Sequence, residues 1–413
     1  MKPSGEWDFS VRPFIVIWEA TRACLLVCKH CRANAITVRH PRELTTEEAL
    51  RLIDQVEGFG EPQPLFIVTG GDPLMRKDIY SIIRHGVERG LRVSIAPSVT
   101  PLLTDRNLER LREAGVSALA LSLDGSNEEI HDGFRGVKGI YGRTLGVIRF
   151  AEGMGLPTQI NTTVTRFNLD DLPNIFRDVY GLGAMMWSVF FLVPTGRGRL
   201  RDEVSPQTYE DVLNLLYDAS KYGVPIKTTE AQHFRRVIMQ RRKWERQGVP
   251  GEKKMLVSQK YFELKRRLVD LMGEAPSEPK HKTLNTRRPG FDVNAGKGFI
   301  FVSHVGDIYP SGFLPIAVGN VREKSIVEIY RESKVLRDLR DPSRLKGKCG
   351  RCEYNRVCGG SRSRAYAVTG DYLEAEPYCI YEPGGGGQES LRRVDTLSRY
   401  EADMDELDLG LKS

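Results

Sequence analysis

The chain has 413 residues, of which 61 are lysine or arginine and 54 are aspartate or glutamate, and its formal net charge is +7. Hydrophobic residues make up 40% and charged residues 28% of the sequence. This balance is that of an average folded protein and excludes a collagen, a disordered chain and a small disulfide scaffold. No run of about 18 apolar residues occurs, so we expect no membrane span. Residues 1–10 lack the basic and apolar regions of a signal peptide, so we expect a cytoplasmic protein.

The first half of the chain alternates apolar, β-rich runs with helical patterns. Candidate strands lie at 14–18, 65–68, 91–96, 118–123, 157–164 and 186–193. Candidate helices lie at 45–58, 77–89, 106–114, 144–153, 169–180 and 205–221. This alternation predicts an α/β fold with a parallel sheet inside a layer of helices, and six units predict a partial (β/α)6 barrel. In such barrels the chemistry lies at the carboxyl ends of the strands.

The remainder of the chain departs from this alternation. We expect four regions in chain order: the barrel at 12–225, a basic helical insertion or linker at 226–290, a smaller α+β domain at 291–383 and a charged tail at 384–413. Helical patterns lie at 231–246 and 254–272, followed by a loop rich in proline and lysine at 276–289. Two short apolar runs, at 298–302 and 306–309, predict a β-hairpin.

The basic region carries more positive charge than the chain as a whole. Between His233 and Arg288 there are 16 lysine or arginine residues and 6 aspartate or glutamate residues, a net charge of +10. A solvated helical face and a docking surface for an anionic partner both explain such a region. Few aromatic residues lie between these charges, so we expect no nucleic-acid partner.

The seven cysteines fall into two groups with none between them. The members are Cys24, Cys28 and Cys31 in the first group, and Cys349, Cys352, Cys358 and Cys379 in the second. Two tight groups in a chain without a secretion signal are typical of metal or iron–sulfur ligands rather than of structural disulfides.

The first cysteine group has the spacing CxxxCxxC and follows the first candidate strand. Three thiolates in one loop can hold three irons of a cubane cluster, which leaves the fourth iron free to bind a small molecule. The same logic separates catalytic from structural zinc sites. A zinc site or a few buried thiols are the alternatives, but the position of the loop at the strand ends of a barrel favours the cluster.

This cysteine spacing resembles the signature of the radical S-adenosylmethionine (SAM) enzymes. His30 stands at the position before the third cysteine, which is usually aromatic in the family. The stretch 69–73 after the second strand resembles the family's GGEP motif, with aspartate in place of glutamate. The resemblance implies that Gly70, Gly71, Asp72 and Pro73 lie at the SAM amino group, where the glycines let the backbone approach the ligand.

Further motifs of the family resemble short stretches on the later strands. Ser122 and Asp124 match the SxD element, which implies a contact with SAM. Arg135, in the stretch His-Asp-Gly-Phe-Arg-Gly, resembles the arginine that pairs with the SAM carboxylate. The resemblance also implies ribose contacts by Asn161 and Thr163, and an adenine contact in the stretch 192–196, which includes Val193. It extends over residues 12–225.

The second cysteine group has the spacing Cx2Cx5C with a fourth cysteine 20 residues further on. It resembles the SPASM extension of radical SAM enzymes and implies one auxiliary 4Fe–4S cluster with four protein ligands. A structural zinc site is the alternative. A full SPASM domain holds two auxiliary clusters, but Ser311 and Arg362 stand where the other cluster needs cysteines. We therefore expect two 4Fe–4S clusters in the chain, one of which binds SAM.

The resemblance also implies the chemistry. The first cluster donates an electron to SAM, and the resulting 5′-deoxyadenosyl radical removes a hydrogen atom from the substrate. A flavodoxin- or ferredoxin-type protein is the implied reductant. The auxiliary cluster either carries an electron to or from the substrate or only stabilises the C-terminal domain.

The substrate is the least specified part of this prediction. The stretches 359–372 and 376–379 resemble the branch that trims carboxylate side chains from iron tetrapyrroles in alternative heme and heme d1 biosynthesis. An anionic tetrapyrrole suits Arg362, Arg364 and the basic region. Peptide maturases share much of this pattern, so modification of a ribosomally made peptide is the alternative. A non-catalytic iron–sulfur redox sensor is a further alternative, but it has no need of the SAM motifs.

Overall fold

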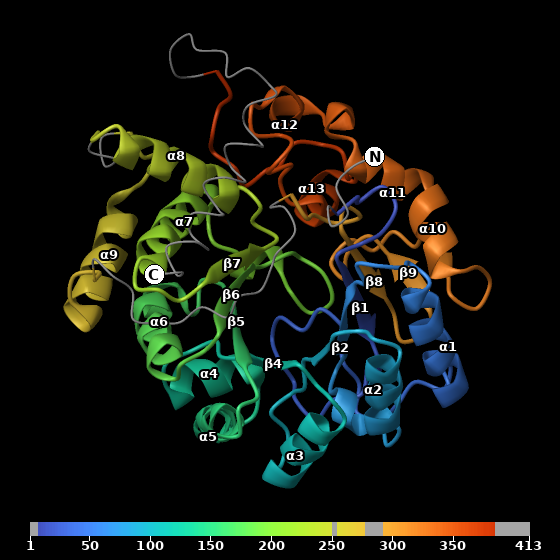
Figure 1. Cartoon of the computed structure of the whole chain (residues 1–413). Coiled ribbons are helices and arrows are strands. Elements are labelled where there is room, and N and C mark those ends of the chain that lie inside the picture. Colours follow the sequence, from blue (N-terminus) through green and yellow to red (C-terminus); the bar gives the residue numbers. More distant parts are fainter. Residues whose placement is uncertain (1–6, 250–253, 277–291, 385–413) are drawn as a thin grey trace.

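The computed structural model describes residues 7–249, 254–276 and 292–384. Its central feature is a curved parallel sheet with helices on the outside (Figure 1). From the first to the seventh strand, neighbours in the sheet are also neighbours in the chain, and all pair in parallel. The strands are β1 (Ile15–Glu19), β2 (Leu65–Thr69), β3 (Val93–Ile95), β4 (Ala118–Ser122), β5 (Thr158–Val164), β6 (Met186–Phe191) and β7 (Ile226–Thr229). The predicted α/β barrel is confirmed.

The connecting helices lie close to their predicted positions. They are α1 (Thr46–Glu57), α2 (Ile79–Glu88), α3 (Asp105–Glu113), α4 (Glu128–Arg135), α5 (Ile140–Gly153), α6 (Leu172–Gly181) and α7 (Pro206–Ser220). Short 3₁₀ turns precede or follow some of them: η1 (Pro73–Met75), η2 (Leu169–Asp171) and η3 (Leu200–Asp202). Helix α4 was not predicted as a helix.

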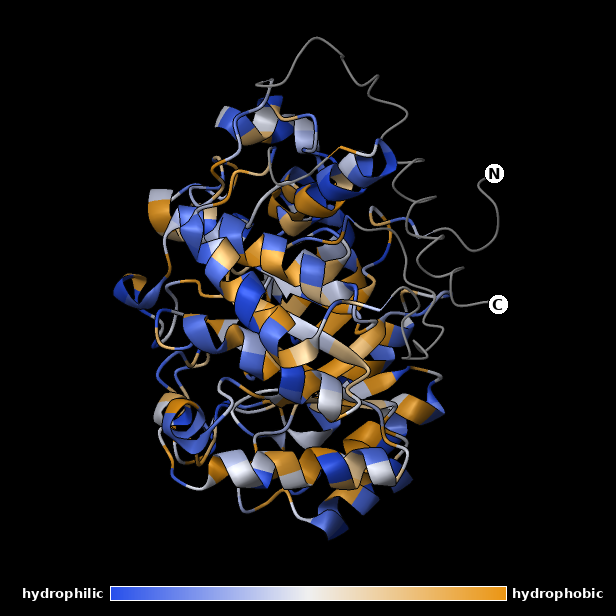
Figure 2. Ribbon diagram, turned by 90° about the vertical axis from the view of Figure 1, so that its left-hand side faces the viewer, coloured by the Kyte–Doolittle hydropathy of each residue, from blue (hydrophilic) through white to orange (hydrophobic). Residues whose placement is uncertain are grey.

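Local sequence explains where these elements begin and which face they bury. At α1, the Thr45 hydroxyl accepts from the Glu48 amide at 3.2 Å, and the Glu48 carboxylate accepts from the Thr45 amide at 2.8 Å. This capping box fixes the start of the helix. Figure 2 shows that the outer helices carry both hydrophobic and hydrophilic residues, while the strands within them are mostly hydrophobic. One face of each helix therefore packs on the sheet.

Strand β5 shows how the sheet separates core from site. Its residues alternate between buried and half-buried positions along all seven residues. Ile160 and Val164 belong to the core that the helices cover. Because successive side chains of a strand point to opposite faces, Asn161 and Thr163 lie on the other face of the sheet.

The sheet is larger than the predicted six strands at both ends, so two predicted boundaries are corrected. Strand β7 pairs with β6, so the barrel continues beyond residue 225 into the region expected to be a helical linker. At the opposite edge, β8 (Phe299–Val302) pairs in parallel with β1. The predicted hairpin forms from β8 and β9 (Asp307–Tyr309), and β10 (Gly319–Asn320) completes the sheet. This pairing satisfies the backbone groups along the free edge of β1.

The remaining helices follow β7 in the chain, and some pack on the barrel helices: α9 contacts α6 and α7, and α10 contacts α1. Helices α8 (Phe234–Arg246) and α9 (Gln259–Met272) confirm the helical patterns of the basic region. Helices α10 (Ile326–Glu332), α11 (Lys334–Arg340), α12 (Gly347–Arg351) and α13 (Arg362–Thr369), with the 3₁₀ turn η5 (Pro342–Arg344), follow the hairpin. Most of the predicted loop at 276–289 and the charged tail beyond residue 384 lie outside the described residues. Across the described ranges, no helix combines the length and the hydropathy needed to cross a bilayer.

Candidate cluster and cofactor sites

The first cysteine group lies in the loop between β1 and α1. Cys24 and Cys28 are buried, and Cys31 is half-buried. The amide of Leu26 donates to Cys24 Sγ and the amide of Ala35 donates to Cys31 Sγ, both at 3.4 Å. Backbone donors to sulfur stabilise the anionic thiolates of iron–sulfur clusters. The loop therefore suits three thiolate ligands.

The glycines of the second motif hold this loop against the sheet. A Cβ atom on Gly70 would lie 2.4 Å from the Thr21 carbonyl oxygen, and one on Gly71 would lie 2.4 Å from that of Ala23. The amide of Asp72 donates to the Ala23 carbonyl at 2.7 Å. Both glycines are thus required for the close packing of two loops. Their predicted approach to SAM remains a prediction.

The carboxylate of Asp72 has a structural role in the same turn. It accepts from the Thr100 hydroxyl at 2.6 Å and from the Leu74 amide at 3.2 Å, which caps the turn that begins at Pro73. Burial raises the pKa of Asp72, and these hydrogen bonds oppose that effect. These bonds position the motif backbone, and the predicted cofactor contact of Asp72 remains a prediction.

Arg135 connects two of the predicted motifs. It forms a buried ion pair with Asp124, whose other oxygen accepts from the Thr163 amide at 2.7 Å. Burial raises the pKa of Asp124, while Arg135 lowers it. Arg135 Nη1 also lies 3.6 Å from Cys28 Sγ.

One nitrogen of this arginine is unsatisfied. Arg135 Nε is buried and has no hydrogen-bond partner among the described residues. A buried donor without an acceptor is costly, so it indicates a missing group. An anionic group beside Cys28, such as the SAM carboxylate predicted there, fits this nitrogen.

The other predicted SAM contacts lie at the carboxyl ends of neighbouring strands. Ser122 ends β4 and pairs in register with Asn161 on β5. The Asn161 side chain accepts from Gln159 at 2.7 Å. Val193 is buried in the loop after β6, where its carbonyl accepts from the Thr195 amide at 2.7 Å. The structure thus brings the predicted motifs to one edge of the sheet, as the barrel requires.

The loop after β6 supports the cysteine loop in a way that the motifs did not predict. Gly196 has a φ of +59°, and a Cβ atom there would lie 2.3 Å from the carbonyl oxygens of Cys31 and Arg32. Arg197 Nε donates to the Cys28 carbonyl at 2.9 Å. A left-handed glycine followed by an arginine is too common a pattern to identify such a contact from sequence.

The second cysteine group surrounds one cavity. All four cysteines line one cavity, together with His233, Arg236 and Lys348. The amide of Glu376 donates to Cys349 Sγ at 3.3 Å and that of Gly360 to Cys358 Sγ at 3.4 Å. Burial raises the pKa of Cys352 to about 12 and that of Cys379 to about 11. Four thiols around one cavity, with backbone donors to two of the sulfurs, suit a metal centre that binds them as thiolates.

Metal ligation itself remains a prediction for both groups. In the part of the chain that the structure describes, no three Cys, His, Asp or Glu side chains converge closely enough for a single metal ion.

His233 is a cavity residue that the motifs did not reveal. It is buried, and its pKa lies well below the usual range, mainly because of burial and then because of the nearby charge of Arg236. Its ring stacks on Tyr209 with 5.8 Å between centroids.

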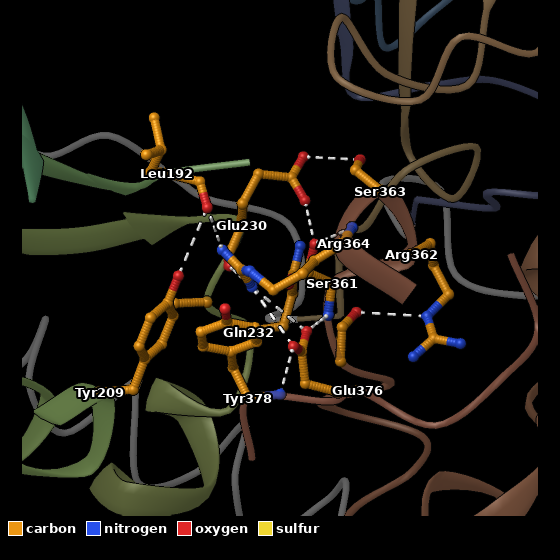
Figure 3. A network of polar contacts seen from close by, with 12 residues as sticks. Leu192, Tyr209, Glu230, Gln232, Ser361, Arg362, Ser363, Arg364, Glu376 and Tyr378 are labelled. Carbon is orange, nitrogen blue, oxygen red and sulfur yellow. Dashed lines mark hydrogen bonds and ion pairs between the residues drawn. The ribbon is translucent and has the colours of Figure 1, made fainter. Parts of the chain in front are cut away.

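Ser311, which stands where another cluster would need a cysteine, belongs to a network of hydroxyl groups around the Glu230 carboxylate. Figure 3 shows Glu230 with Ser361 and Ser363. Ser311 and Ser363 donate to one oxygen of Glu230 at 3.2 and 3.0 Å, and Ser361 donates to the other. Glu230 is buried and has a φ of +59°, which is unusual for a residue with a side chain. Ser311, which has no thiol, is therefore hydrogen-bonded within this polar network.

The two arginines predicted to bind an anionic substrate are instead internal. Arg362 donates to the carbonyl oxygens of Tyr372 and Glu374 at 3.1 and 2.7 Å. Arg364 donates to the Leu192 carbonyl at 2.9 Å and pairs with Glu376. Figure 3 shows Arg364 among these partners. Both side chains are fully buried, so their substrate role was wrongly predicted.

The basic region is also partly internal. Arg236 pairs with Glu210 on α7 at 3.0 Å, and Arg241 pairs with Asp218 at 2.6 Å. All four side chains are largely buried. These arginines belong neither to a solvated face nor to a docking surface; they attach α8 to the barrel.

Comparisons with known proteins agree with the site. The model of the radical SAM superfamily matches residues 18–179. An AdoMet-dependent heme synthase of Methanosarcina barkeri is 43% identical over 90% of this chain and 97% of that protein. One of Oleidesulfovibrio alaskensis is 40% identical over 89% of this chain and 87% of that protein.

Other branches are more distant. The pre-heme d1 synthase of Dinoroseobacter shibae is 26% identical over 88% of this chain and 85% of that protein. The PqqA peptide cyclase of Bradyrhizobium diazoefficiens is 27% identical over 90% of this chain and 87% of that protein. Both predicted branches are therefore among its relatives.

A solved structure shows the same fold. The crystal structure of Streptococcus suis SuiB with S-adenosylmethionine has a TM-score of 0.63 and 14% identity, and it covers 90% of this chain and 78% of that chain. Given the sequence relatives that match along almost its whole length, this chain is an enzyme of the radical SAM superfamily, and membership implies a 4Fe–4S cluster and SAM.

Proposed function

We propose that this enzyme removes carboxyl groups from the side chains of an iron tetrapyrrole, as a heme-forming reaction requires. The observation that carries the proposal is the 43% identity to a heme synthase over 97% of that protein. A peptide cyclase with similar coverage is only 27% identical. The tetrapyrrole substrate is therefore favoured over a peptide.

The proposal assigns a cofactor to each cysteine group. Cys24, Cys28 and Cys31 hold the 4Fe–4S cluster that binds SAM, and the second group holds an auxiliary 4Fe–4S cluster. When bound, the first cluster supplies the electron that cleaves SAM to a 5′-deoxyadenosyl radical. A flavodoxin- or ferredoxin-type protein supplies that electron. Backbone donors to the sulfurs in both groups support this assignment.

The residues of the chain position SAM in this proposal. Asp124 holds Arg135 beside Cys28, and the unsatisfied Nε of Arg135 donates to the SAM carboxylate. Asn161 and Thr163, which lie on the face of β5 away from the helix-covered core, contact the ribose. The loop that contains Val193 contacts the adenine.

The surface beside the cysteine loop suits a flat, anionic substrate. Val27 and Phe167 are 59% and 52% exposed. Lys29 lies 5.2 Å from the centroid of the Phe167 ring. Exposed apolar side chains next to a cation are typical of a ligand site, and a macrocycle with carboxylates matches both features.

The reaction balances for each side chain. Removal of a hydrogen atom from the carbon β to the carboxylate leaves a carbon radical. Loss of CO2 and of one electron then gives an alkene, and the electron passes to a one-electron acceptor protein. The 5′-deoxyadenosyl radical becomes 5′-deoxyadenosine when it takes this hydrogen atom from the substrate.

The test is anaerobic turnover of the reconstituted full chain with an iron porphyrin that carries propionate side chains. We expect mass spectrometry to show the loss of CO2 and two hydrogen atoms per side chain, together with 5′-deoxyadenosine. Porphyrin left unchanged while SAM is cleaved would overturn the substrate, and a modified precursor peptide would establish the maturase alternative.

A further inference from the structure

His233 is a buried histidine to which no described residue offers a hydrogen bond. It lies before the first residue of α8 and is 1% exposed. Neither Nδ1 nor Nε2 has a partner among the described residues. A buried polar group left unsatisfied costs about 1–3 kcal/mol. Such a group in a folded protein indicates a partner outside the polypeptide, such as a bound cofactor.

The position of the histidine identifies that partner. His233 lines the cavity that the four C-terminal cysteines share. Its ring lies at 16° to that of Tyr209, and this stacking fixes the plane of the imidazole. The unsatisfied nitrogens therefore belong to a ring of fixed orientation at the edge of the cysteine cavity.

The cations of the same cavity already have partners. Arg236 is paired with Glu210. Lys348 donates to the carbonyl oxygen of Cys379 and lies 3.3 Å from Glu382. Both cations are thus held by protein groups, although Arg236 Nε has no partner among the described residues. His233 differs because neither of its ring nitrogens has a partner there, and it has an N–H to donate.

We propose that His233 donates a hydrogen bond to a sulfur atom of the cluster held by Cys349, Cys352, Cys358 and Cys379. This inference rests on the proposed auxiliary cluster. Four thiolates complete the ligation of four irons, so the histidine has no vacant iron to bind and acts as a donor. Hydrogen bonds to the sulfurs of a cluster help to set its reduction potential.

The direction of the effect follows from charge. Reduction adds negative charge to the cluster, and a hydrogen-bond donor stabilises the more negative state. His233 therefore raises the reduction potential of the auxiliary cluster. Removing the donor lowers that potential without removing a ligand.

The experiment compares full-length His233→Leu and His233→Gln with the wild type after anaerobic reconstitution. Iron and sulfide are counted, and the reduction potential is measured by redox titration followed by electron paramagnetic resonance. The spectrum of the first cluster changes when SAM is added, which separates the two signals. His85→Gln is the control, because His85 lies on α2 and pairs with Asp54.

We expect about eight irons in all four proteins, which corresponds to two four-iron clusters. The potential of the auxiliary cluster should fall in His233→Leu, recover at least partly in His233→Gln, whose amide can donate, and stay unchanged in His85→Gln. In 15N-histidine-labelled wild type, pulsed resonance should show a weak nitrogen coupling to this cluster that His233→Gln loses.

Two results would overturn the role of His233: an unchanged potential in His233→Leu with full iron content, or no nitrogen coupling in the wild type. Loss of about four irons from a folded His233→Leu variant would also overturn it, because the histidine would then be needed to hold the cluster. If the wild type itself holds only about four irons, the proposed auxiliary cluster fails, and the iron count distinguishes this case.

Discussion

Arg364 Nη2 donates to the carbonyl oxygen of Leu192 at 2.9 Å. This bond joins α13, which lies between Cys358 and Cys379, to the loop after β6, where the adenine contact is predicted. Nη1 of the same side chain donates to the Glu230 carbonyl at 2.7 Å, just beyond β7. One guanidinium thus fixes the C-terminal region to the carboxyl ends of two barrel strands.

Substitution of Arg364 by methionine should therefore destabilise the whole chain. Its ion pair with Glu376 is fully buried, and breaking such a pair leaves a buried charge unpaired, which costs about 3–5 kcal/mol. The matched control is Lys346→Met, which breaks an exposed pair with Asp371 and should change stability little. The denaturant concentration at the midpoint of unfolding measures the stability of both variants. Equal midpoints for the two variants would show that Arg364 is not a structural anchor.

Substitutions in the two cysteine groups should have different effects on SAM cleavage. We expect Cys28→Ala and Cys352→Ala each to lose about four of eight irons. Only Cys28→Ala should abolish 5′-deoxyadenosine formation, because only the first group binds SAM. Cys352→Ala should still cleave SAM but should not convert the porphyrin. The measurements are iron content and product chromatography, and SAM cleavage by Cys28→Ala would contradict the assignment.

Asp124→Asn should weaken SAM binding. The amide oxygen still accepts from the Thr163 amide, but the charge that holds Arg135 beside Cys28 is lost. Loss of a charged hydrogen bond of about 1.4 kcal/mol raises a dissociation constant about tenfold. Equilibrium dialysis with labelled SAM measures this constant. The control is Asp170→Asn, which removes an exposed ion pair with Lys260 and should leave the dissociation constant for SAM unchanged.

Glu203 should make stability depend on pH. Burial raises the pKa of Glu203 from 4.5 to about 7, against the attraction of Arg364. The unfolded chain therefore releases this proton at lower pH than the folded chain. The resulting stabilisation is complete below pH 4.5 and is lost as the pH rises through 7; it amounts to about 3 kcal/mol.

Glu203→Gln removes this dependence, because glutamine does not titrate. Relative to the wild type, the variant should gain stability as the pH rises from about 5 to about 8. Denaturant unfolding at several pH values measures the difference. A difference that does not change with pH would show that Glu203 is ionised in the folded chain throughout this range.

Arg241→Gln should affect folding rather than substrate binding. The side chain is buried between α7 and α8 and donates to both Asn214 and Asp218. We expect a loss of about 3–5 kcal/mol in stability. The Michaelis constant for the porphyrin, measured at low temperature where the variant stays folded, should not change. A raised, salt-dependent Michaelis constant would restore the docking role first predicted for this region.

Local patterns explain why so much of the barrel was predictable. Each of the six predicted strands is an apolar run followed by a helical period, and each cysteine group is defined by short spacings. Strand β7 escaped prediction because its four residues, Ile-Lys-Thr-Thr, are half-buried and only partly apolar. The pairing of Ile15 with Phe299 joins segments far apart in the chain, which no local pattern specifies.

Local sequence patterns also did not specify which groups the side chains contact. Arg362 and Arg364 were expected to face a substrate because arginine commonly binds carboxylates. Whether an arginine meets a ligand or a carbonyl oxygen depends on which segments fold around it. The contact of Arg364 with Leu192 spans the barrel and the C-terminal region, and composition carries no information about such distances.

The parallel pairing of β8 with β1 has a consequence for any attempt to study the barrel by itself. A chain that ended after β7 would leave the amide and carbonyl groups of Ile15–Glu19 without partners along one side. An exposed strand edge of this kind recruits strands from other molecules. The isolated barrel would therefore tend to aggregate.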